Sequence, residues 1–163
     1  MYKDMKKEYD ERIFHLDSAQ EYADDEATCS KVKVGSVIIT KEGKEIFGCN
    51  HGVENCKVNG CRRIKLYGNA LKEHRLPSDC DALHSEVDAI CKASSKGFAL
   101  DGATIYVTRY PCEACARAIA ESGIKRVVYG RSETISPYTA LILRSANVEV
   151  IHQISWKRED NNE

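Results

Sequence analysis

The sequence predicts an α/β fold, specifically a three-layer α/β/α sandwich with a five-stranded mixed sheet. Two observations indicate this class: an early pair of strands follows a helical segment, and helix and strand then alternate toward the end of the chain. Such alternation favours parallel strands joined by right-handed crossovers, with helices on both faces of the sheet. A chain of 163 residues can bury one ordinary core, so we expect a single domain over residues 1–163.

The first half of the chain predicts a helix and a hairpin. Apolar side chains recur at helical spacing over residues 8–27, and residues 32–40 are rich in β-branched side chains. A turn at residues 41–44 leads into a second strand over residues 45–49. Residues 51–83 are polar, cysteine-rich and without periodicity, so we expect an irregular loop insertion there. A loop of that length usually carries function or is held by a metal.

The second half predicts three helices and three strands: helix 84–96, strand 103–109, helix 112–123, strand 125–130, helix 136–146 and strand 147–152. A polar tail follows over residues 157–163. In open α/β sheets, ligands bind beyond the carboxyl ends of the strands. Residues 108–112 lie at such an end, so we expect the functional site there.

Composition predicts a soluble globular protein, since 42% of the residues are apolar and 30% are charged. No apolar run approaches the roughly 18 residues of a membrane span, and the first residues lack the apolar stretch of a signal peptide. We therefore expect a cytoplasmic location and no membrane partner. In a reducing compartment the eight cysteines are thiols or metal ligands. A net charge of −1 disfavours nucleic acid as a partner.

The strongest chemical signal is His84-Ser85-Glu86 together with Pro111-Cys112-Glu113-Ala114-Cys115. This H-x-E…P-C-x-x-C pattern is the signature of zinc-dependent nucleobase deaminases. One imidazole and two thiolates supply the three protein ligands of a catalytic zinc, whose fourth position is kept for water. Glu86 is close enough in sequence to carry protons for that water without binding the metal. Both motifs fall in the first turn of a predicted helix, where the helix dipole favours thiolate.

Two other interpretations of a C-x-x-C pair are a structural zinc site and a redox pair. A zinc ribbon needs a second C-x-x-C, which this chain lacks. A redox pair gives no role to His84 or Glu86. The combined pattern therefore favours a catalytic zinc.

The chain resembles the deoxycytidylate deaminase branch of the cytidine deaminase superfamily. Besides the zinc motifs, the likeness rests on Asn50-His51-Gly52, in the place of that branch's Tyr-Asn-Gly turn, and on residues 29–38, 116–119, 122–125, 137–140 and 146–150. It covers about residues 10–152 and is interrupted at residues 51–83. The resemblance implies a cytidine deaminase-like fold and hydrolysis of dCMP to dUMP with release of ammonia. It also implies a small nucleotide as partner and a homo-oligomeric assembly.

The chain departs from the family pattern at two positions beside the motifs. Ser85 replaces the usual alanine of H-A-E, a small change from which we expect little effect. Cys49 replaces the aromatic that usually precedes the asparagine, which we expect to alter the shape of the sugar pocket.

The resemblance also suggests residues that bind substrate. Asn50 matches the family residue that hydrogen-bonds the sugar; the alternative is a turn asparagine in the left-handed region. Tyr138 is a candidate for enclosing the nucleotide, with helix packing as the alternative. Arg109, beside the zinc motif, is a further candidate. Basic residues of the loop could bind a 5′-phosphate or form a solvated charged face: Arg62, Arg63, Lys65, Lys72 and Arg75.

A second, structural zinc is also suggested, because Cys29 and Cys56 lie where phage deoxycytidylate deaminases place ligands of such an ion. The first choice of ligands is Cys29, Cys56, Cys61 and Cys80, with His74 nearby. The alternative is a set of small, partly buried thiols. For Cys49 and Cys91 we expect core packing.

Two further functions stay open beside the dCMP reaction. One is another deaminase of the same superfamily, acting on a nucleoside, guanine or another heterocycle, or tRNA. The other is a zinc-stabilised interaction module without activity, against which Glu86 argues because a purely structural site needs no proton carrier.

Overall fold

The computed structural model describes residues 2–52, 55–68, 80–132 and 135–156. Its centre is one five-stranded sheet in the order β2-β1-β3-β4-β5. The strands are β1 (Gly35–Ile39), β2 (Glu45–Cys49), β3 (Thr104–Arg109), β4 (Arg126–Arg131) and β5 (Glu149–His152). β1 pairs antiparallel with β2 and β3, whereas β3, β4 and β5 run parallel. The mixed sheet predicted from the sequence is confirmed.

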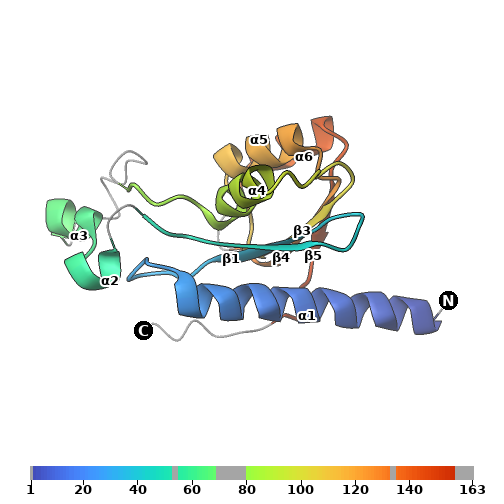
Figure 1. The fold of residues 1–163 in the computed structure, drawn as a ribbon, viewed down its shortest axis with the longest axis horizontal. Coiled ribbons are helices and arrows are strands. Elements are labelled where there is room, and N and C mark those ends of the chain that lie inside the picture. The colour runs from blue at the N-terminus through green and yellow to red at the C-terminus, as the bar shows by residue number, and fades with distance from the viewer. Residues whose placement is uncertain (1, 53–54, 69–79, 133–134, 157–163) are drawn as a thin grey trace.

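Helices cover both faces of this sheet. The long helix α1 (Tyr2–Glu26) crosses one face, and three helices lie on the other (Figure 1). These three are α4 (Ser85–Ser95), α5 (Glu113–Ser122) and α6 (Pro137–Ser145). On the α1 side, Leu16 is buried against Val37 and Val128. On the other side, Ala89 and Ile119 share a core with the opposite faces of the same strands. The three-layer α/β/α architecture is therefore confirmed.

A glycine on β2 sets how closely α4 lies on the sheet. A Cβ at Gly48 would lie 2.2 Å from the carbonyl oxygen of Ser85 and 2.6 Å from the amide nitrogen of Ala89. Real side chains do not tolerate such distances, so only glycine lets the start of α4 approach this strand. Since the H-x-E motif lies at that helix end, this close contact helps to place the site.

The expectation of an irregular loop over residues 51–83 is wrong in part. Two short helices lie there, α2 (Cys56–Asn59) and α3 (Arg62–Tyr67). Helices this short show no 3.6-residue periodicity in the sequence; α2 begins instead at a local cap, where the Asn55 side chain accepts from the Lys57 N–H. An isolated β-bridge between His51 and Leu83 joins the two ends of the segment.

The first helix also starts earlier than predicted, at Tyr2, because its first turns carry charged residues that favour a helix without adding an apolar stripe. The other predicted elements lie within three residues of their observed bounds. Lys72, His74 and Arg75, and the tail 157–163, lie outside the described residues. Across the described ranges, no helix combines the length and apolarity needed to span a bilayer.

Candidate active site

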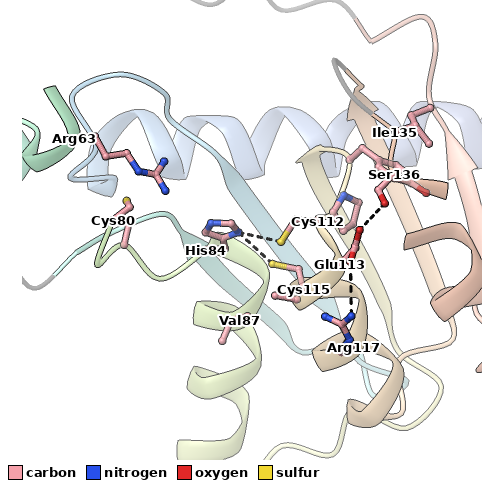
Figure 2. A pocket seen from close by; sticks show the side chains of 14 residues that line it. Arg63, Cys80, His84, Val87, Cys112, Glu113, Cys115, Arg117, Ile135 and Ser136 are labelled. Carbon is pink, nitrogen blue, oxygen red and sulfur yellow. Dashed lines mark hydrogen bonds and ion pairs between the residues drawn. The ribbon is translucent and has the colours of Figure 1, made fainter. Parts of the chain in front are cut away.

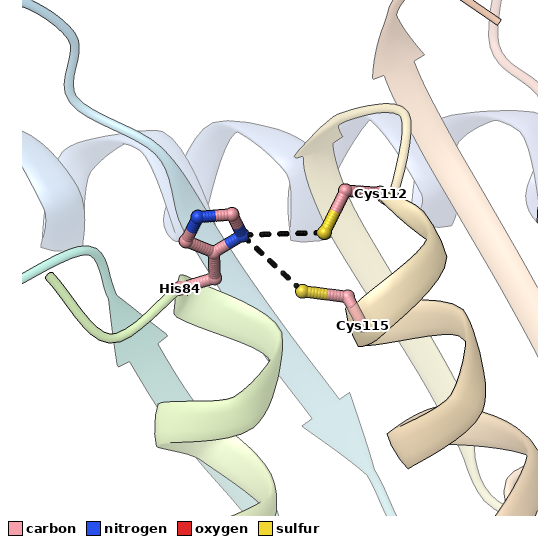
Figure 3. A group of neighbouring side chains, drawn as sticks. All are labelled: His84, Cys112 and Cys115. Atoms are coloured by element: carbon pink, nitrogen blue, oxygen red, sulfur yellow. Dashed lines mark hydrogen bonds between the residues drawn. The ribbon is translucent and has the colours of Figure 1, made fainter. Parts of the chain in front are cut away.

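Two helix starts bring the motif residues together at the carboxyl end of β3. His84 is the N-cap of α4 and Cys112 is the N-cap of α5, while Cys115 lies in the first turn of α5. The His84 Nδ1 atom is 3.5 Å from the Cys112 Sγ atom and 3.4 Å from the Cys115 Sγ atom (Figure 3). Within the described residues, this is the group of potential ligand atoms that all lie within 4.8 Å of one another.

These separations fit a zinc ion. Zn–S bonds of about 2.3 Å and a Zn–N bond of about 2.0 Å, at tetrahedral angles, put a nitrogen and a sulfur ligand about 3.5 Å apart. The two observed nitrogen–sulfur distances are 3.5 and 3.4 Å. One imidazole and two cysteines are also donors that zinc prefers. The three side chains therefore offer donor atoms whose types and nitrogen–sulfur spacings suit zinc.

The protons in this cluster are shared unevenly. Hydrogen bonds from Cys115 and then His84 lower the pKa of Cys112 to about 3. The hydrogen bond to Cys112, together with burial, raises the pKa of Cys115. The hydrogen bond with Cys112 likewise raises the pKa of His84. Because a metal binds thiolate and neutral imidazole, zinc binding here competes with protons.

Glu86 lies next to this cluster in the first turn of α4. Its side chain is buried, with the residue only 4% exposed, and burial raises the pKa of its carboxyl group. The Ser85 Oγ atom donates to Glu86 Oε2 over 3.0 Å, a contact that an alanine at position 85 could not make. Ser85 is itself anchored, because the Ser36 hydroxyl donates to its carbonyl oxygen over 2.8 Å. The carboxyl group is therefore held in place and kept away from bulk water.

Two cavities meet at His84 and Cys112. The smaller has a volume of about 170 Å³, and its lining includes Asn50, Glu86 and Arg109. The larger has a volume of about 1000 Å³ and extends from Arg63 on one side to the start of α5 on the other (Figure 2). Small-molecule sites commonly occupy about 300–1,000 Å³. The small cavity therefore suits a single ring, whereas the large one has room for a whole nucleotide.

Asn50 and Arg109 both lie at the small cavity. The Asn50 side chain also holds the approach to β1, since its Oδ1 accepts from the Val34 N–H and its Nδ2 donates to the Val32 carbonyl, each over 2.8 Å. An amide has a further donor and acceptor position, so a ligand contact stays available. The alternative of a left-handed turn is wrong, because Asn147 is the non-glycine residue with positive φ among those described.

Tyr138 does not join the site. It lies on α6, is 64% exposed, and is not among the described residues that line either cavity. Its exposure also excludes the helix-packing alternative. In the same way, Cys91 is exposed on α4 and the expected core packing is wrong, whereas Cys49 is buried as expected.

The cysteines of the loop are neighbours but do not form a closed ligand group. Burial raises the pKa of Cys56, and the thiols of Cys61, Cys29 and Cys80 raise it further. These four thiols therefore share one region. Their sulfur atoms do not meet the 4.8 Å spacing found at His84. Of the basic residues of this loop within the described range, Arg63 lines the large cavity.

Other polar contacts at the site do not follow from the zinc motifs. Glu113 accepts from the Ser136 hydroxyl over 2.7 Å and lies 3.7 Å from Arg117 (Figure 2). The hydrogen bond from Ser136 ties the start of α6 to the start of α5, and the ion pair lies within α5.

Asp88, one turn after His84, is a buried carboxylate bonded to Lys92 over 2.6 Å. The spacing of Asp88 and Lys92 by four residues was the available signal for that pair.

Fold and site together define the class: a deaminase-like α/β sandwich whose metal-ligating side chains lie beyond the carboxyl end of a central strand. A model of the MafB19-like deaminase family matches residues 9–158, and the chain belongs to this family. The chain also belongs to the deoxycytidylate deaminase branch, since it is 34% identical to a member of which it covers 80%.

The chain is 43% identical over 98 residues to the deoxycytidylate deaminase of Enterobacteria phage T4, covering 53% of this chain and 51% of that protein. It is 34% identical over 106 residues to the deoxycytidylate deaminase of Mycobacterium phage D29, covering 62% of this chain and 80% of that protein. The structure of a dCMP deaminase from cyanophage S-TIM5, in complex with dCMP and dUMP, is similar in fold: the TM-score is 0.65 at 23% identity, covering 91% of this chain and 96% of that one. The chain spans about half the length of the phage T2 and T4 relatives.

Proposed function

We propose that this protein is a zinc-dependent deaminase that hydrolyses dCMP to dUMP and ammonia. The observation that carries the proposal is the His84/Cys112/Cys115 group, whose nitrogen–sulfur distances of 3.5 and 3.4 Å match tetrahedral zinc, beside a buried glutamate. The choice of dCMP is supported by the names of the phage relatives.

His84, Cys112 and Cys115 are the proposed zinc ligands. When bound, zinc supplies a Lewis acid that lowers the pKa of a water from about 15.7 toward 7. Glu86 accepts a proton from the water whose oxygen bonds to C4 of the cytosine ring, and it passes this proton to N3. It then takes the second proton, from the hydroxyl on C4, and gives it to the amino group, which leaves as ammonia while the C4 carbonyl forms. One carboxyl group suffices because these transfers occur in sequence. Its burial keeps the proton from exchanging with bulk water between transfers.

The two cavities suggest where the base, the sugar and the phosphate of the nucleotide bind. The base enters the small cavity, where Glu86 and Arg109 lie, and Asn50 contacts the sugar through its remaining hydrogen-bonding positions. The phosphate extends into the large cavity toward Arg63, whose guanidinium suits a phosphate. Cys29, Cys56, Cys61 and Cys80 are proposed to close around a second, structural zinc when that ion is present. The proposal includes a cytoplasmic location, in keeping with the composition of the chain, and a homo-oligomer, as the family branch suggests.

The test is ammonia release from dCMP, CMP, deoxycytidine, cytidine and guanine at equal concentrations, with zinc content measured on the same samples. We expect the highest kcat/KM for dCMP. Equal kcat/KM for dCMP and deoxycytidine would remove the nucleotide assignment and leave the wider deaminase proposal. Release of no ammonia from any of the five by the zinc-loaded protein would refute the proposal and leave two alternatives, a deaminase of tRNA or another heterocycle and a non-catalytic zinc module.

A further inference from the structure

The short segment 49–52 places Asn50 at the small cavity, and several contacts hold this segment from the α1 and β1 side. The Asn50 N–H donates to the Val34 carbonyl over 3.1 Å, and its carbonyl accepts from the Thr28 N–H over 3.3 Å. The Gly52 N–H donates to the Thr28 hydroxyl over 3.1 Å. None of these contacts relates Asn50 to α4, the helix that carries Glu86.

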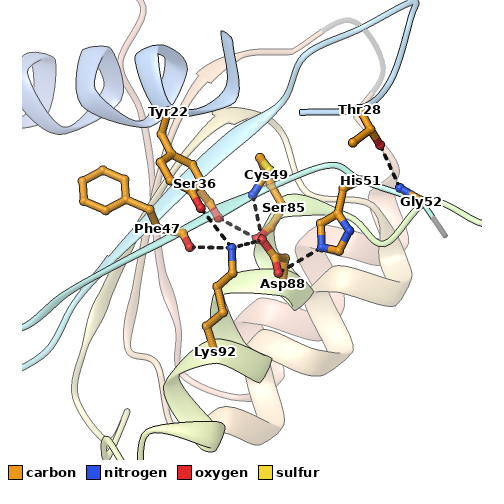
Figure 4. Close-up of polar contacts among 10 residues, drawn as sticks. All are labelled: Tyr22, Thr28, Ser36, Phe47, Cys49, His51, Gly52, Ser85, Asp88 and Lys92. Atoms are coloured by element: carbon orange, nitrogen blue, oxygen red, sulfur yellow. Dashed lines mark hydrogen bonds and ion pairs between the residues drawn. The ribbon is translucent and has the colours of Figure 1, made fainter. Parts of the chain in front are cut away.

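Asp88 of α4 supplies that relation. Its Oδ2 atom accepts from the Cys49 N–H over 3.0 Å, and its Oδ1 atom lies 3.2 Å from the His51 Nε2 atom (Figure 4). One carboxylate therefore contacts both chain neighbours of Asn50. Asp88 follows Glu86 by two residues on the same helix, so the proton carrier and this contact belong to one rigid element.

The carboxylate is itself fixed. The Asp88 side chain is 5% exposed, and Lys92, one helical turn later, donates to its Oδ2 atom over 2.6 Å. Lys92 also donates to the Tyr22 hydroxyl over 3.2 Å and to the Phe47 carbonyl over 3.4 Å. A buried carboxylate with a counter-charge and two further partners holds one geometry, because any displacement leaves a buried polar group unpaired.

A backbone bridge extends the same connection to a proposed zinc ligand. The His51 N–H donates to the Leu83 carbonyl over 3.2 Å, and the Leu83 N–H donates to the His51 carbonyl over 2.7 Å. Leu83 directly precedes His84. Holding the His51 side chain therefore also holds the strand-like segment that leads into the site.

We propose that Asp88 is a positioning residue that sets the location of Asn50 relative to Glu86, and that His51 transmits part of this effect. This inference rests on the proposed function, in which Asn50 contacts the nucleotide. Its consequence is specific: loss of the Asp88 contacts weakens substrate binding more than it slows the chemical step, since Glu86 and the zinc ligands stay on their own helices.

The test compares Asp88→Ala, Asp88→Asn, His51→Ala and Lys92→Met, with Cys91→Ala, at an exposed position of the same helix, as the control. Asp88→Ala removes both contacts to segment 49–52, and its KM for dCMP should rise about tenfold while kcat changes less than about threefold. Asp88→Asn keeps an oxygen acceptor for the Cys49 N–H, so its KM for dCMP should stay close to that of the wild-type protein. His51→Ala removes one contact and should raise KM about threefold. Lys92→Met keeps the carboxylate but removes its counter-charge, so it should lower Tm and raise KM less than Asp88→Ala does, whereas Cys91→Ala should leave KM unchanged.

Amide hydrogen exchange in the absence of substrate gives a second readout. In Asp88→Ala, the Cys49 N–H loses its acceptor and should exchange faster, with zinc content unchanged. An unchanged KM and unchanged Cys49 exchange in this variant would overturn the inference, as would an equal fall in kcat and zinc content. If Asp88→Ala does not fold, His51→Ala decides by its KM for dCMP, and a KM equal to that of the wild-type protein would overturn the inference. If the wild-type protein does not act on dCMP, the proposed function fails, and the exchange rates still decide whether Asp88 holds the segment.

Discussion

Replacing Glu86 with glutamine separates proton transfer from structure. The amide has the same shape as the carboxyl group, and the Ser85 hydroxyl can still donate to its oxygen, as it does to Glu86 over 3.0 Å. General acid–base catalysis by one positioned group contributes about 10²–10⁴-fold. Since Glu86 is proposed to serve several transfers, we expect a loss of at least about 10⁴-fold in kcat, which equals about 5.4 kcal/mol of activation free energy.

The same substitution should not cost stability. Burial raises the pKa of Glu86, so the folded metal-free protein binds a proton there more tightly than the unfolded chain does. A raised pKa means that this stabilising contribution is complete below the unfolded pKa and is lost as pH rises through the folded pKa. A neutral glutamine has no such loss. At pH 7 the metal-free Glu86→Gln variant should therefore be at least as stable as the wild-type protein.

The assay measures ammonia release at saturating dCMP, zinc per chain and the urea dependence of unfolding for both proteins. Ser85→Ala is the control, because it removes a hydrogen bond to the carboxyl group but keeps the group itself. Its kcat should fall by less than about tenfold. A Glu86→Gln protein with more than about a tenth of the wild-type rate would refute the proton-carrier role. Loss of zinc together with activity would also refute the reasoning, since Glu86 would then serve the metal.

Three other substitutions test the remaining parts of the proposal. Cys115→Ala should remove zinc from the site together with activity, as metal analysis and ammonia release will show, because two protein ligands are left. Cys56→Ser should lower zinc by one ion per chain and lower Tm; an unchanged count and Tm would return the loop cysteines to the role of packed thiols. Arg63→Ala should raise KM for dCMP several-fold but leave deoxycytidine turnover unaffected, since a charge-assisted bond to phosphate is lost; an equal effect on both substrates would remove Arg63 from the phosphate site.

The parts of the site that could be predicted from the sequence are those fixed by local structure. His84 and Cys112 are N-caps, and Cys115 follows within the same helical turn as Cys112. Spacing along the chain therefore determines where these side chains point once the helices form. The strands were predictable for a similar reason, because β-branched residues mark β1, β3 and β4.

The contacts that could not be predicted depend on pairings distant in sequence. Asp88 contacts Cys49 and His51 across 39 and 37 residues, and no local pattern encodes that pairing. The exposure of Tyr138 and Cys91 could not be predicted for the same reason, because the neighbouring elements decide which face of a short helix is covered. The helices α2 and α3 are too short for their periodicity to be visible.

The departure of Cys49 from the family pattern shows why a site residue cannot be judged from its side chain alone. The expectation was that losing the usual aromatic would reshape the sugar pocket, yet Cys49 is not among the described residues that line either cavity. Its side chain is instead buried with Ala23 and Ala27 against Tyr22, where α1 meets β2. Position 49 contributes its backbone N–H to the site, and this N–H donates a hydrogen bond to the Asp88 carboxylate. Every amino acid except proline has that donor, so the side chain here can change to suit the α1 contact while the link to α4 is kept.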